Sequence, residues 1–347
     1  MKKCLIVKQS VGIDIGKDEF YACYTALDQN GQSKIKGTKR FENNSSGMNY
    51  FINWCSRLNK TPEISLLFLM EATGVYHEEL AYFLHNQEQK VLVVLAQRVK
   101  YFAKSCNLKT KTDKVDSKMI AGFALERNFS EIDYWTPPCK DFKIIRDLAR
   151  EHTSLQQAKT AIKNQKHALL IAHNIYQDVL DLKEQQLKFY ELQIEKVEQL
   201  LKEMVDQNKE FSQRLEKLTT IKGLKFITLI KILAETNGFL LFKNIRQLVS
   251  YAGLDVIEKE SGKFIGKTKI SKKGNARIRA ALYMPALTAL QHNKNLRVFY
   301  KRINEGRQIK RQGVIAVMRK LLILTYTLWK KNEKYDENYQ EILMVSG

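Results

Sequence analysis

The sequence predicts an α/β domain at the N-terminus, followed by a mostly helical remainder. Segments rich in β-forming residues alternate with helical ones up to about residue 127. No proline lies between Pro138 and Pro285, so that stretch is free to be helical. An apolar seam of helical spacing runs through its middle. The 347 residues, 44% of them hydrophobic, are enough for two or three domains with buried cores.

The N-terminal domain, placed at residues 1–150, is predicted to have a ribonuclease-H-like order of elements. Three strands come first, with a turn around Asn30-Gly31 before the third, and they span 11–16, 19–27 and 34–41. Continuous apolar runs at 65–70 and 90–95 are typical of strands buried on both faces. Helical stretches follow each run, at 76–85 and up to about 127. A meander followed by strand–helix–strand–helix fits the ribonuclease-H-like order.

The second part, residues 151–212, is predicted to be a long helical, coiled-coil segment. Its apolar residues alternate spacings of three and four, as in a coiled-coil seam: Leu187, Tyr190, Ile194, Val197, Leu201 and Met204. The seam covers only about three heptads. It fits an antiparallel hairpin within one chain as well as a coiled coil between two chains.

The third part, residues 213–347, is predicted to be a mostly helical, strongly basic domain. The segment 218–224 resembles the hinge of a helix-hairpin-helix, in which Gly223 would let backbone amides approach a phosphate. A plain interhelical turn fits the segment at least as well. Asn275 is suited to cap a helix from Ala276 towards Gln291, and a last helix is predicted over 314–330.

One glycine-rich segment of this domain contains Gly-Lys-Thr but is not a nucleotide-binding loop. Gly262 and Gly266 enclose three residues, whereas a P-loop needs four between its glycines. No buried strand leads into the segment and no helix follows it at once. Taken alone, Ser261-Gly262 is typical of a turn.

The charge balance predicts a polyanionic partner. Lys and Arg number 58 against 37 Asp and Glu, a net charge of +21 that repels itself unless it meets a polyanion such as nucleic acid. The candidate nucleic-acid-binding residues are Lys111, Lys114, Lys222, Lys263, Lys267, Lys269, Lys272, Lys273, Arg277, Arg279, Lys310, Arg311, Arg319 and Lys320. Aromatic residues among them can stack on unpaired bases, although core packing is expected for Phe264 and Tyr283.

The sequence argues against a membrane span, a zinc site and a disulfide framework, and an anionic membrane surface is a weaker candidate partner than nucleic acid. No apolar run is long enough to span a bilayer. The five cysteines are scattered and contain no CxxC pair, which argues against a zinc site or a disulfide framework and indicates a reducing, cytoplasmic location.

Four acidic residues predict a divalent-metal site. Asp14 ends the first strand, Glu71 ends the apolar strand at 65–70, and Asp113 and Asp116 share one face of a helix because they are three residues apart. Two divalent ions about 3.5–4 Å apart need several hard oxygen ligands on rigid elements. Each acid alone is equally explained as a cap, a dipole partner or a solvated charge, so the prediction depends on their conjunction.

Together these segments resemble one family over nearly the whole chain. It comprises bacterial insertion-sequence transposases with an N-terminal DEDD RuvC-like domain and a C-terminal serine-bearing transposase domain, which act as recombinases guided by an element-encoded bridge RNA. The matching segments are Gly12–Asp14, Met70–Tyr76, Lys111–Met119, Ile221–Leu224, Tyr251–Leu254, Glu260–Gly262, Ser271–Ala286 and Met318–Leu321. Val256 stands where the family usually has a proline.

The resemblance implies a site and a set of partners. Asp14, Glu71, Asp113 and Asp116 would bind Mg²⁺, for which Mn²⁺ can substitute, and Ser261 would be the nucleophile that forms a phosphoserine link with DNA. Ser261 of one subunit would work with the acidic site of the same or another subunit. The implied partners are donor and target DNA, a structured guide RNA, and further copies of the chain in a dimer or tetramer.

Two other functions fit the residues. A RuvC-like junction resolvase would share the carboxylates but use metal-activated water as its nucleophile. A non-catalytic nucleic-acid-binding protein would use the same acids only as helix caps.

Overall fold

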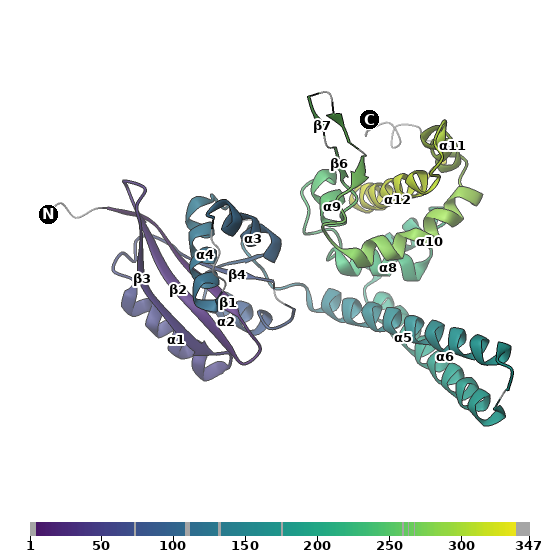
Figure 1. Cartoon of the computed structure of the whole chain (residues 1–347), viewed down its shortest axis with the longest axis horizontal. Coiled ribbons are helices and arrows are strands. Elements are labelled where there is room, and N and C mark those ends of the chain that lie inside the picture. The colour runs from purple at the N-terminus through teal and green to yellow at the C-terminus, as the bar shows by residue number, and fades with distance from the viewer. Residues whose placement is uncertain are drawn as a thin grey trace. The chain divides into compact units, whose positions relative to one another are not determined.

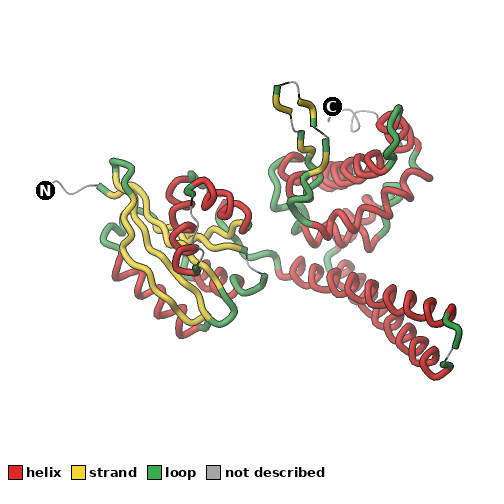
Figure 2. Tube along the Cα trace, in the orientation of Figure 1, coloured by secondary structure: helices red, strands yellow, loops and turns green. Residues whose placement is uncertain are grey.

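The computed structural model describes residues 5–72, 74–107, 112–130, 133–174, 176–258, 260–262, 264–266 and 268–337. The chain forms two compact units, Met1–Pro137 and Pro138–Gly347. The first unit is a sheet with helices, and the second is helical apart from one narrow β-hairpin (Figures 1 and 2). The domain boundary predicted at residue 150 lies inside a helix of the second unit.

The first unit is built on a five-stranded mixed sheet with the strand order β3-β2-β1-β4-β5. The strands are β1 (Ile6–Ile15), β2 (Glu19–Asp28), β3 (Ser33–Glu42), β4 (Leu66–Glu71) and β5 (Lys90–Val94). The first three form an antiparallel meander, and β4 and β5 continue the sheet parallel to β1. This arrangement confirms the α/β prediction for the N-terminal part and is compatible with a ribonuclease-H-like fold.

Four helices cover the sheet: α1 (Ser45–Leu58), α2 (Glu78–Asn86), α3 (Ala96–Ser105) and α4 (Asp113–Glu126). Helix α1 was not predicted, although its signals are in the sequence. The side chain of Asn44 caps it, and Met48, Phe51 and Cys55 recur at helical spacing on its buried face. Phe51 packs edge-on against Phe20 of β2, with ring centroids 5.2 Å apart.

Gly12 determines how closely α4 approaches the sheet. A Cβ atom on Gly12 would lie 2.1 Å from the backbone nitrogen of Ala121 and 2.3 Å from the carbonyl oxygen of Ser117. Ser10, two residues earlier on β1, donates a hydrogen bond of 2.9 Å to the carbonyl oxygen of Ala121. The backbone of α4 therefore rests directly on β1, and only glycine fits at the contact.

We expect the substitution Gly12→Ala to lower the free energy of unfolding by at least about 3 kcal/mol, because rigid helix backbone occupies the space that the methyl group needs. Thermal and urea unfolding measure this. Gly122→Ala, in the middle of α4, is the matched control. Its Cβ would lie 3.5 Å from the Phe102 ring, an ordinary contact, so helix propensity should raise stability by up to about 1 kcal/mol. Equal stability of the two variants would contradict this account of the packing.

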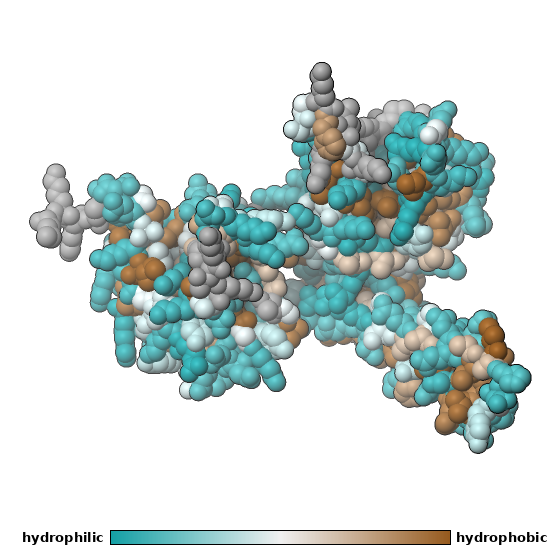
Figure 3. Space-filling view, in the orientation of Figure 1, coloured by the Kyte–Doolittle hydropathy of each residue, from teal (hydrophilic) through white to brown (hydrophobic). Residues whose placement is uncertain are grey.

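The second unit begins with an antiparallel pair of long helices, α5 (Lys140–Ile171) and α6 (Gln177–Asp206). Three polar contacts join them at seven-residue steps on both helices: the hydrogen bond between His152 and Glu198, and the ion pairs Lys159–Glu191 and Lys166–Glu184. The structure thus contains the hairpin alternative within one chain, and a coiled coil between chains stays a prediction. Near the hairpin turn apolar side chains are exposed, including Ile171 and Tyr176 (Figure 3).

The described residues form six further helices around a common core, and the mostly buried α12 is the central one. They are α7 (Lys209–Thr219), α8 (Phe226–Glu235), α9 (Ile245–Tyr251), α10 (Ala276–His292), α11 (Lys294–Asn304) and α12 (Arg311–Lys331). The side chain of Asn275 caps α10, and α12 contains the last predicted helix, so both expectations are confirmed. Among the described residues, no helix is both long and apolar enough to cross a membrane.

Gly223 lies in the turn between α7 and α8, with a φ of +103°. A Cβ there would lie 2.8 Å from the carbonyl oxygen of Pro285 and 2.8 Å from the Cβ of Ala289, both on α10. The glycine is therefore required for packing against α10. This contact favours the plain interhelical turn over a helix-hairpin-helix.

Candidate active-site residues

Asp14 and Glu71 are neighbours at one edge of the sheet. Strands β1 and β4 run parallel, and their last registered pair is Ile13 with Met70. Asp14 and Glu71 are the next residue on each strand. Both strands therefore end in a carboxylate at adjacent positions, which is the arrangement expected where parallel strands of an α/β sheet form a site.

The contacts of α4 bring its first turn to the same edge. Lys8 donates a hydrogen bond to the carbonyl oxygen of Leu125, Ser10 donates to that of Ala121, and Gly12 abuts Ser117. Each two-residue step along β1 thus corresponds to four residues back along α4, because about 6.6 Å of strand matches about 6 Å of helix. Continued by one step, the same spacing predicts that Asp113 lies near Asp14.

Helix α4 begins at this edge with both of its acidic residues in the first turn. The hydroxyl oxygen of Thr112 accepts a hydrogen bond from the Val115 amide, and its carbonyl oxygen accepts one of 2.8 Å from the Asp116 amide. Asp113 is exposed, while Asp14, Glu71 and Asp116 are partly buried. The backbone therefore places Asp14 beside Glu71 and packs α4 along β1, with Asp113 and Asp116 in the first turn of that helix.

This donor set suits a hard divalent cation, since all of its ligand atoms would be carboxylate oxygens. In the described part of the chain, however, no three or more His, Cys, Asp or Glu side chains are grouped closely enough to hold a metal ion. The structure accordingly places Asp14 beside Glu71, and a site made by all four carboxylates stays a prediction. Lys111, predicted beside them, lies outside the described residues.

Ser261 lies at the tip of a β-hairpin that we call the serine arm, residues 256–270. Strands β7 (Glu260–Ser261) and β8 (Phe264–Ile265) pair at its tip, and β6 (Val256–Ile257) and β9 (Lys269–Ile270) pair at its base. Figure 1 shows the arm extending away from the helices of its own unit. Ser261 is exposed, and Gly262 after it has a φ of +57°, which confirms the predicted turn.

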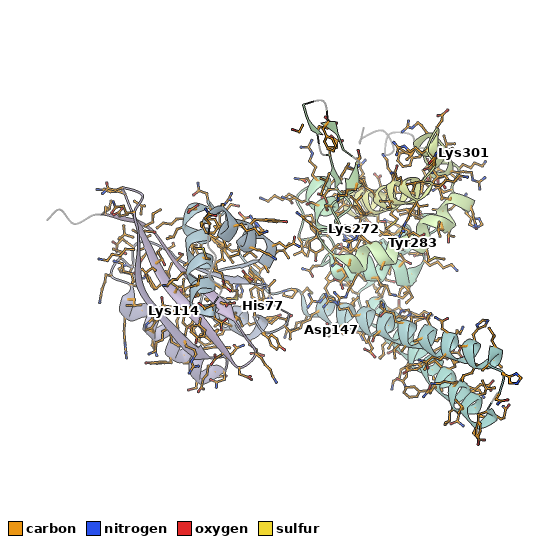
Figure 4. All side chains as sticks on the ribbon, viewed as in Figure 1. His77, Lys114, Asp147, Lys272, Tyr283 and Lys301 are labelled. Carbon is orange, nitrogen blue, oxygen red and sulfur yellow. The ribbon has the colours of Figure 1, made fainter. Side chains whose placement is uncertain are left out.

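The base of the arm is fixed by backbone hydrogen bonds across it. Ser271 donates to the Asp255 carbonyl (2.9 Å), and Asn275 donates to the Tyr251 carbonyl (2.6 Å). Gly274 has a φ of +151°, and a Cβ there would lie 2.3 Å from the same Tyr251 oxygen. The motifs Tyr251–Leu254 and Ser271–Ala286 thus form the two sides of the base. Lys272 marks this place in Figure 4.

A buried carboxylate joins this base to the helical core. Glu235 of α8 accepts two hydrogen bonds from Arg150 (2.8 and 3.1 Å) and one from the Asn275 side-chain amide (2.7 Å). The side-chain oxygen of Asn275 (Oδ1) accepts hydrogen bonds from the backbone nitrogens of Arg277 and Ile278, and it thereby caps α10. Glu235 therefore orients Asn275, which lies between the end of the arm and the start of α10. Sequence reasoning missed this network.

Burial acts to raise the pKa of the Glu235 carboxyl, but the hydrogen bonds from Arg150 and Asn275 outweigh it, and the pKa is lowered from its ordinary value of 4.5. A lowered folded-state pKa means that the ionised form stabilises the fold above pH 4.5, and that this contribution is lost as the pH falls through the folded-state pKa.

We expect Glu235→Gln to cost about 2 kcal/mol of unfolding free energy at pH 7, because it removes charge-assisted hydrogen bonds from a buried site. The difference from the unchanged protein should shrink below pH 4.5. Urea unfolding between pH 3.5 and 7.5 measures both effects. Glu210→Gln is the control, because Glu210 pairs with Arg214 on the exposed surface of α7 and should change stability little at any pH. A difference independent of pH would refute the assignment.

The predicted basic residues have different environments. The exposed ones are Lys114, Lys222, Lys269, Lys272, Lys273, Arg277, Lys310 and Arg311. Lys222 pairs with Glu337 (2.8 Å), Arg279 donates to the Ala252 carbonyl (2.8 Å), and Lys320 is 8% exposed. Arg319 is partly buried. Lys263 and Lys267 lie outside the described residues.

The expectation that Phe264 and Tyr283 pack in the core is wrong. Phe264 is 64% exposed on β8, and Tyr283 is 37% exposed on α10 (Figure 4). Two-residue strands at the end of a hairpin have no second layer to cover them, which explains the exposure of Phe264.

Comparison with known proteins assigns both halves of the chain to transposases. A family model described as a transposase, of the IS110 DEDD type, matches residues 11–175. A second model, described as the transposase IS116/IS110/IS902 family, matches residues 215–301.

Two similar proteins extend over almost the same length. The chain is 29% identical over 340 residues to the pilin gene-inverting protein of Moraxella bovis. The aligned region covers 96% of this chain and 99% of that protein. It is 29% identical over 338 residues to the protein of the same name from Moraxella lacunata, with the same shares covered. A shorter match, 35% over 94 residues, covers 26% of this chain and 23% of a Sinorhizobium fredii protein named as transposase y4rJ.

Proposed function

The chain belongs to the IS116/IS110/IS902 family of transposases, and on that premise we propose that it cuts and rejoins DNA through a phosphoserine link at Ser261. The observation that carries the proposal is the placement of Ser261. It is an exposed hydroxyl at the tip of a projecting arm, and a buried network fixes the base of that arm. A nucleophile for a large substrate needs this combination of access and orientation.

The proposed reaction conserves one phosphoester bond at each step. The Ser261 oxygen forms a bond to phosphorus and loses its proton, the bond from phosphorus to the 3′-oxygen breaks, and that oxygen takes up a proton. In rejoining, a strand's 3′-hydroxyl attacks the phosphoserine and the serine hydroxyl is released. No ATP is consumed, because the phosphoserine link keeps the energy of the broken bond.

A free serine hydroxyl is a weak nucleophile, and the four carboxylates are the proposed source of assistance. Asp14, Glu71, Asp113 and Asp116 would hold divalent cations, which we propose to be Mg²⁺ with Mn²⁺ as a substitute. When bound, such ions stabilise negative charge on the phosphate and on the leaving oxygen. The adjacency of Asp14 and Glu71 and the packing of α4 along β1 support this assignment.

We extend the proposal to partners. The net charge of +21 supports a nucleic-acid partner, and we propose that donor DNA, target DNA and a structured guide RNA bind to a dimer or tetramer of this chain. The Moraxella relatives are named for inverting a pilin gene. Inversion requires rejoining as well as cutting, which supports the same chemistry here.

A junction resolvase that uses metal-activated water is the second candidate, favoured by the same carboxylate edge. The test is to incubate end-labelled DNA spanning this reading frame and its flanks with the protein, Mg²⁺ and RNA transcribed from the flanks. We expect label to migrate with the denatured protein until protease removes it. Cut DNA without any protein-linked label would instead support hydrolysis.

A further inference from the structure

An aromatic side chain faces the same way as the proposed nucleophile. In the hairpin at the arm tip, Ser261 pairs directly with Phe264. Directly opposite residues of an antiparallel pair project from the same face, with Cβ atoms about 4.5–5.5 Å apart. Whatever lies against the Ser261 hydroxyl therefore also meets the Phe264 ring.

The ring contributes little to the fold of its own unit. Phe264 is 64% exposed, whereas Phe239 and Phe211 in the same unit are 0% and 9% exposed. Its ring is therefore accessible to a partner from outside the unit.

The charge of the arm indicates which partner. The arm, residues 256–270, contains four lysines and two glutamates in its sequence, and Lys272 and Lys273 follow it closely. A sequence in which lysines alternate with an exposed aromatic residue is typical of segments that bind single-stranded nucleic acid, because cations bind the phosphates while a ring stacks on a base. An apolar protein surface would gain nothing from this surplus of positive charge.

The reach of the ring indicates which base. If Ser261 contacts a phosphorus atom, a ring whose Cβ lies about 5 Å to the side is within reach of the sugar or base attached to that phosphate. On the basis of the proposed function, we propose that Phe264 stacks on the base next to the scissile phosphate and holds that nucleotide unpaired and in line with Ser261.

The test uses DNA in which 2-aminopurine replaces each base in turn near the cut position, which adduct mapping defines. Binding is followed in full-length protein carrying Ser261→Ala, so that no covalent step intervenes. At one position next to the scissile phosphate, we expect fluorescence to rise as the base unpairs and then to be quenched by the ring. In the Ser261→Ala protein, the further substitution Phe264→Ala should abolish the quenching of 2-aminopurine fluorescence. Phe264→Trp in place of Phe264→Ala should preserve the quenching.

The rate of adduct formation gives a second readout in protein that retains Ser261. Phe264→Ala should lower the single-turnover rate about tenfold or more, the factor equivalent to 1.4 kcal/mol and within the range measured for one stacked base. Phe264→Leu, which is apolar but has no π-face, should be as slow. Val256→Ala, which removes an apolar side chain that is 50% exposed at the arm base, should be unchanged.

The outcomes separate this inference from the proposed function. If the unchanged protein forms no adduct, the serine mechanism fails whatever Phe264 does. If it forms adducts at the same rate with Phe264→Ala and no 2-aminopurine signal depends on the ring, only the stacking role is overturned. A change of oligomeric state in Phe264→Ala, with normal fluorescence and rate, would assign the ring to a protein contact and overturn the inference as well.

Discussion

Protein-linked DNA is expected to disappear when Ser261 is replaced by alanine. The substitution removes the only atom that can form the proposed phosphoserine bond, so the rate of adduct formation should fall by at least about 10³-fold, as losses of a catalytic nucleophile do. Ser261 is exposed at the arm tip, so folding and DNA affinity should be retained. Denaturing gels of labelled DNA measure the adduct, and mobility shifts measure binding.

Thr268→Ala is the matched control for this experiment. Thr268 is an exposed hydroxyl residue on the same arm, so its loss tests whether any change of the arm surface suffices. We expect Thr268→Ala to form adducts at the normal rate. Adducts that persist in Ser261→Ala would show that another residue is the nucleophile. Unlinked cut DNA that persists there would identify water as the nucleophile.

The arm itself shows where sequence reasoning ends. Its strands are two residues long, too short for alternation to show, so the sequence predicts only the turn at Gly262. The network at its base was hidden for another reason. Arg150 and Asn275 meet Glu235 across 85 and 40 residues, and nothing local distinguishes that glutamate from an ordinary one at a helix end.

The longer elements were predictable because their signals are local. The apolar runs of β4 and β5, the Asn275 cap and the periodicity of α12 each lie within a few residues of the element they specify. Helix α1 carries a similar cap and spacing and was missed through neglect of those signals. Gly12 is intermediate, since a glycine in a strand suggests close approach, but its partner Ala121 is identified only by the fold.

The candidate metal site combines both kinds of information. The spacing of Asp113 and Asp116 is local, whereas the adjacency of Asp14 and Glu71 depends on the parallel pairing of β1 with β4. That pairing places Asp14 beside Glu71, and the packing of α4 along β1 predicts that the first turn of α4 lies near Asp14 as well.

We therefore expect Asp14→Asn to abolish both adduct formation and divalent-metal binding. Asparagine has nearly the same shape, so the sheet should be preserved while a charged ligand is lost, and the rate should fall by at least about 10³-fold. Calorimetry with Mg²⁺ and Mn²⁺ measures the binding. The control is Glu126→Gln at the other end of α4, about 20 Å from the first turn, which should bind metal normally.

Thermal unfolding of the Asp14→Asn and unchanged proteins, in EDTA and in Mg²⁺, separates a metal ligand from a structural residue. Asparagine keeps the shape and one acceptor oxygen of the aspartate, so in EDTA the Asp14→Asn protein should have a stability close to that of the unchanged protein. Saturating Mg²⁺ should stabilise only the unchanged protein, by about 2.7 kcal/mol at a concentration one hundred times the Kd. If Asp14 serves only as a structural cap, the substitution instead lowers stability in EDTA and leaves the Mg²⁺ response intact, because a lost hydrogen bond destabilises whether or not metal is present.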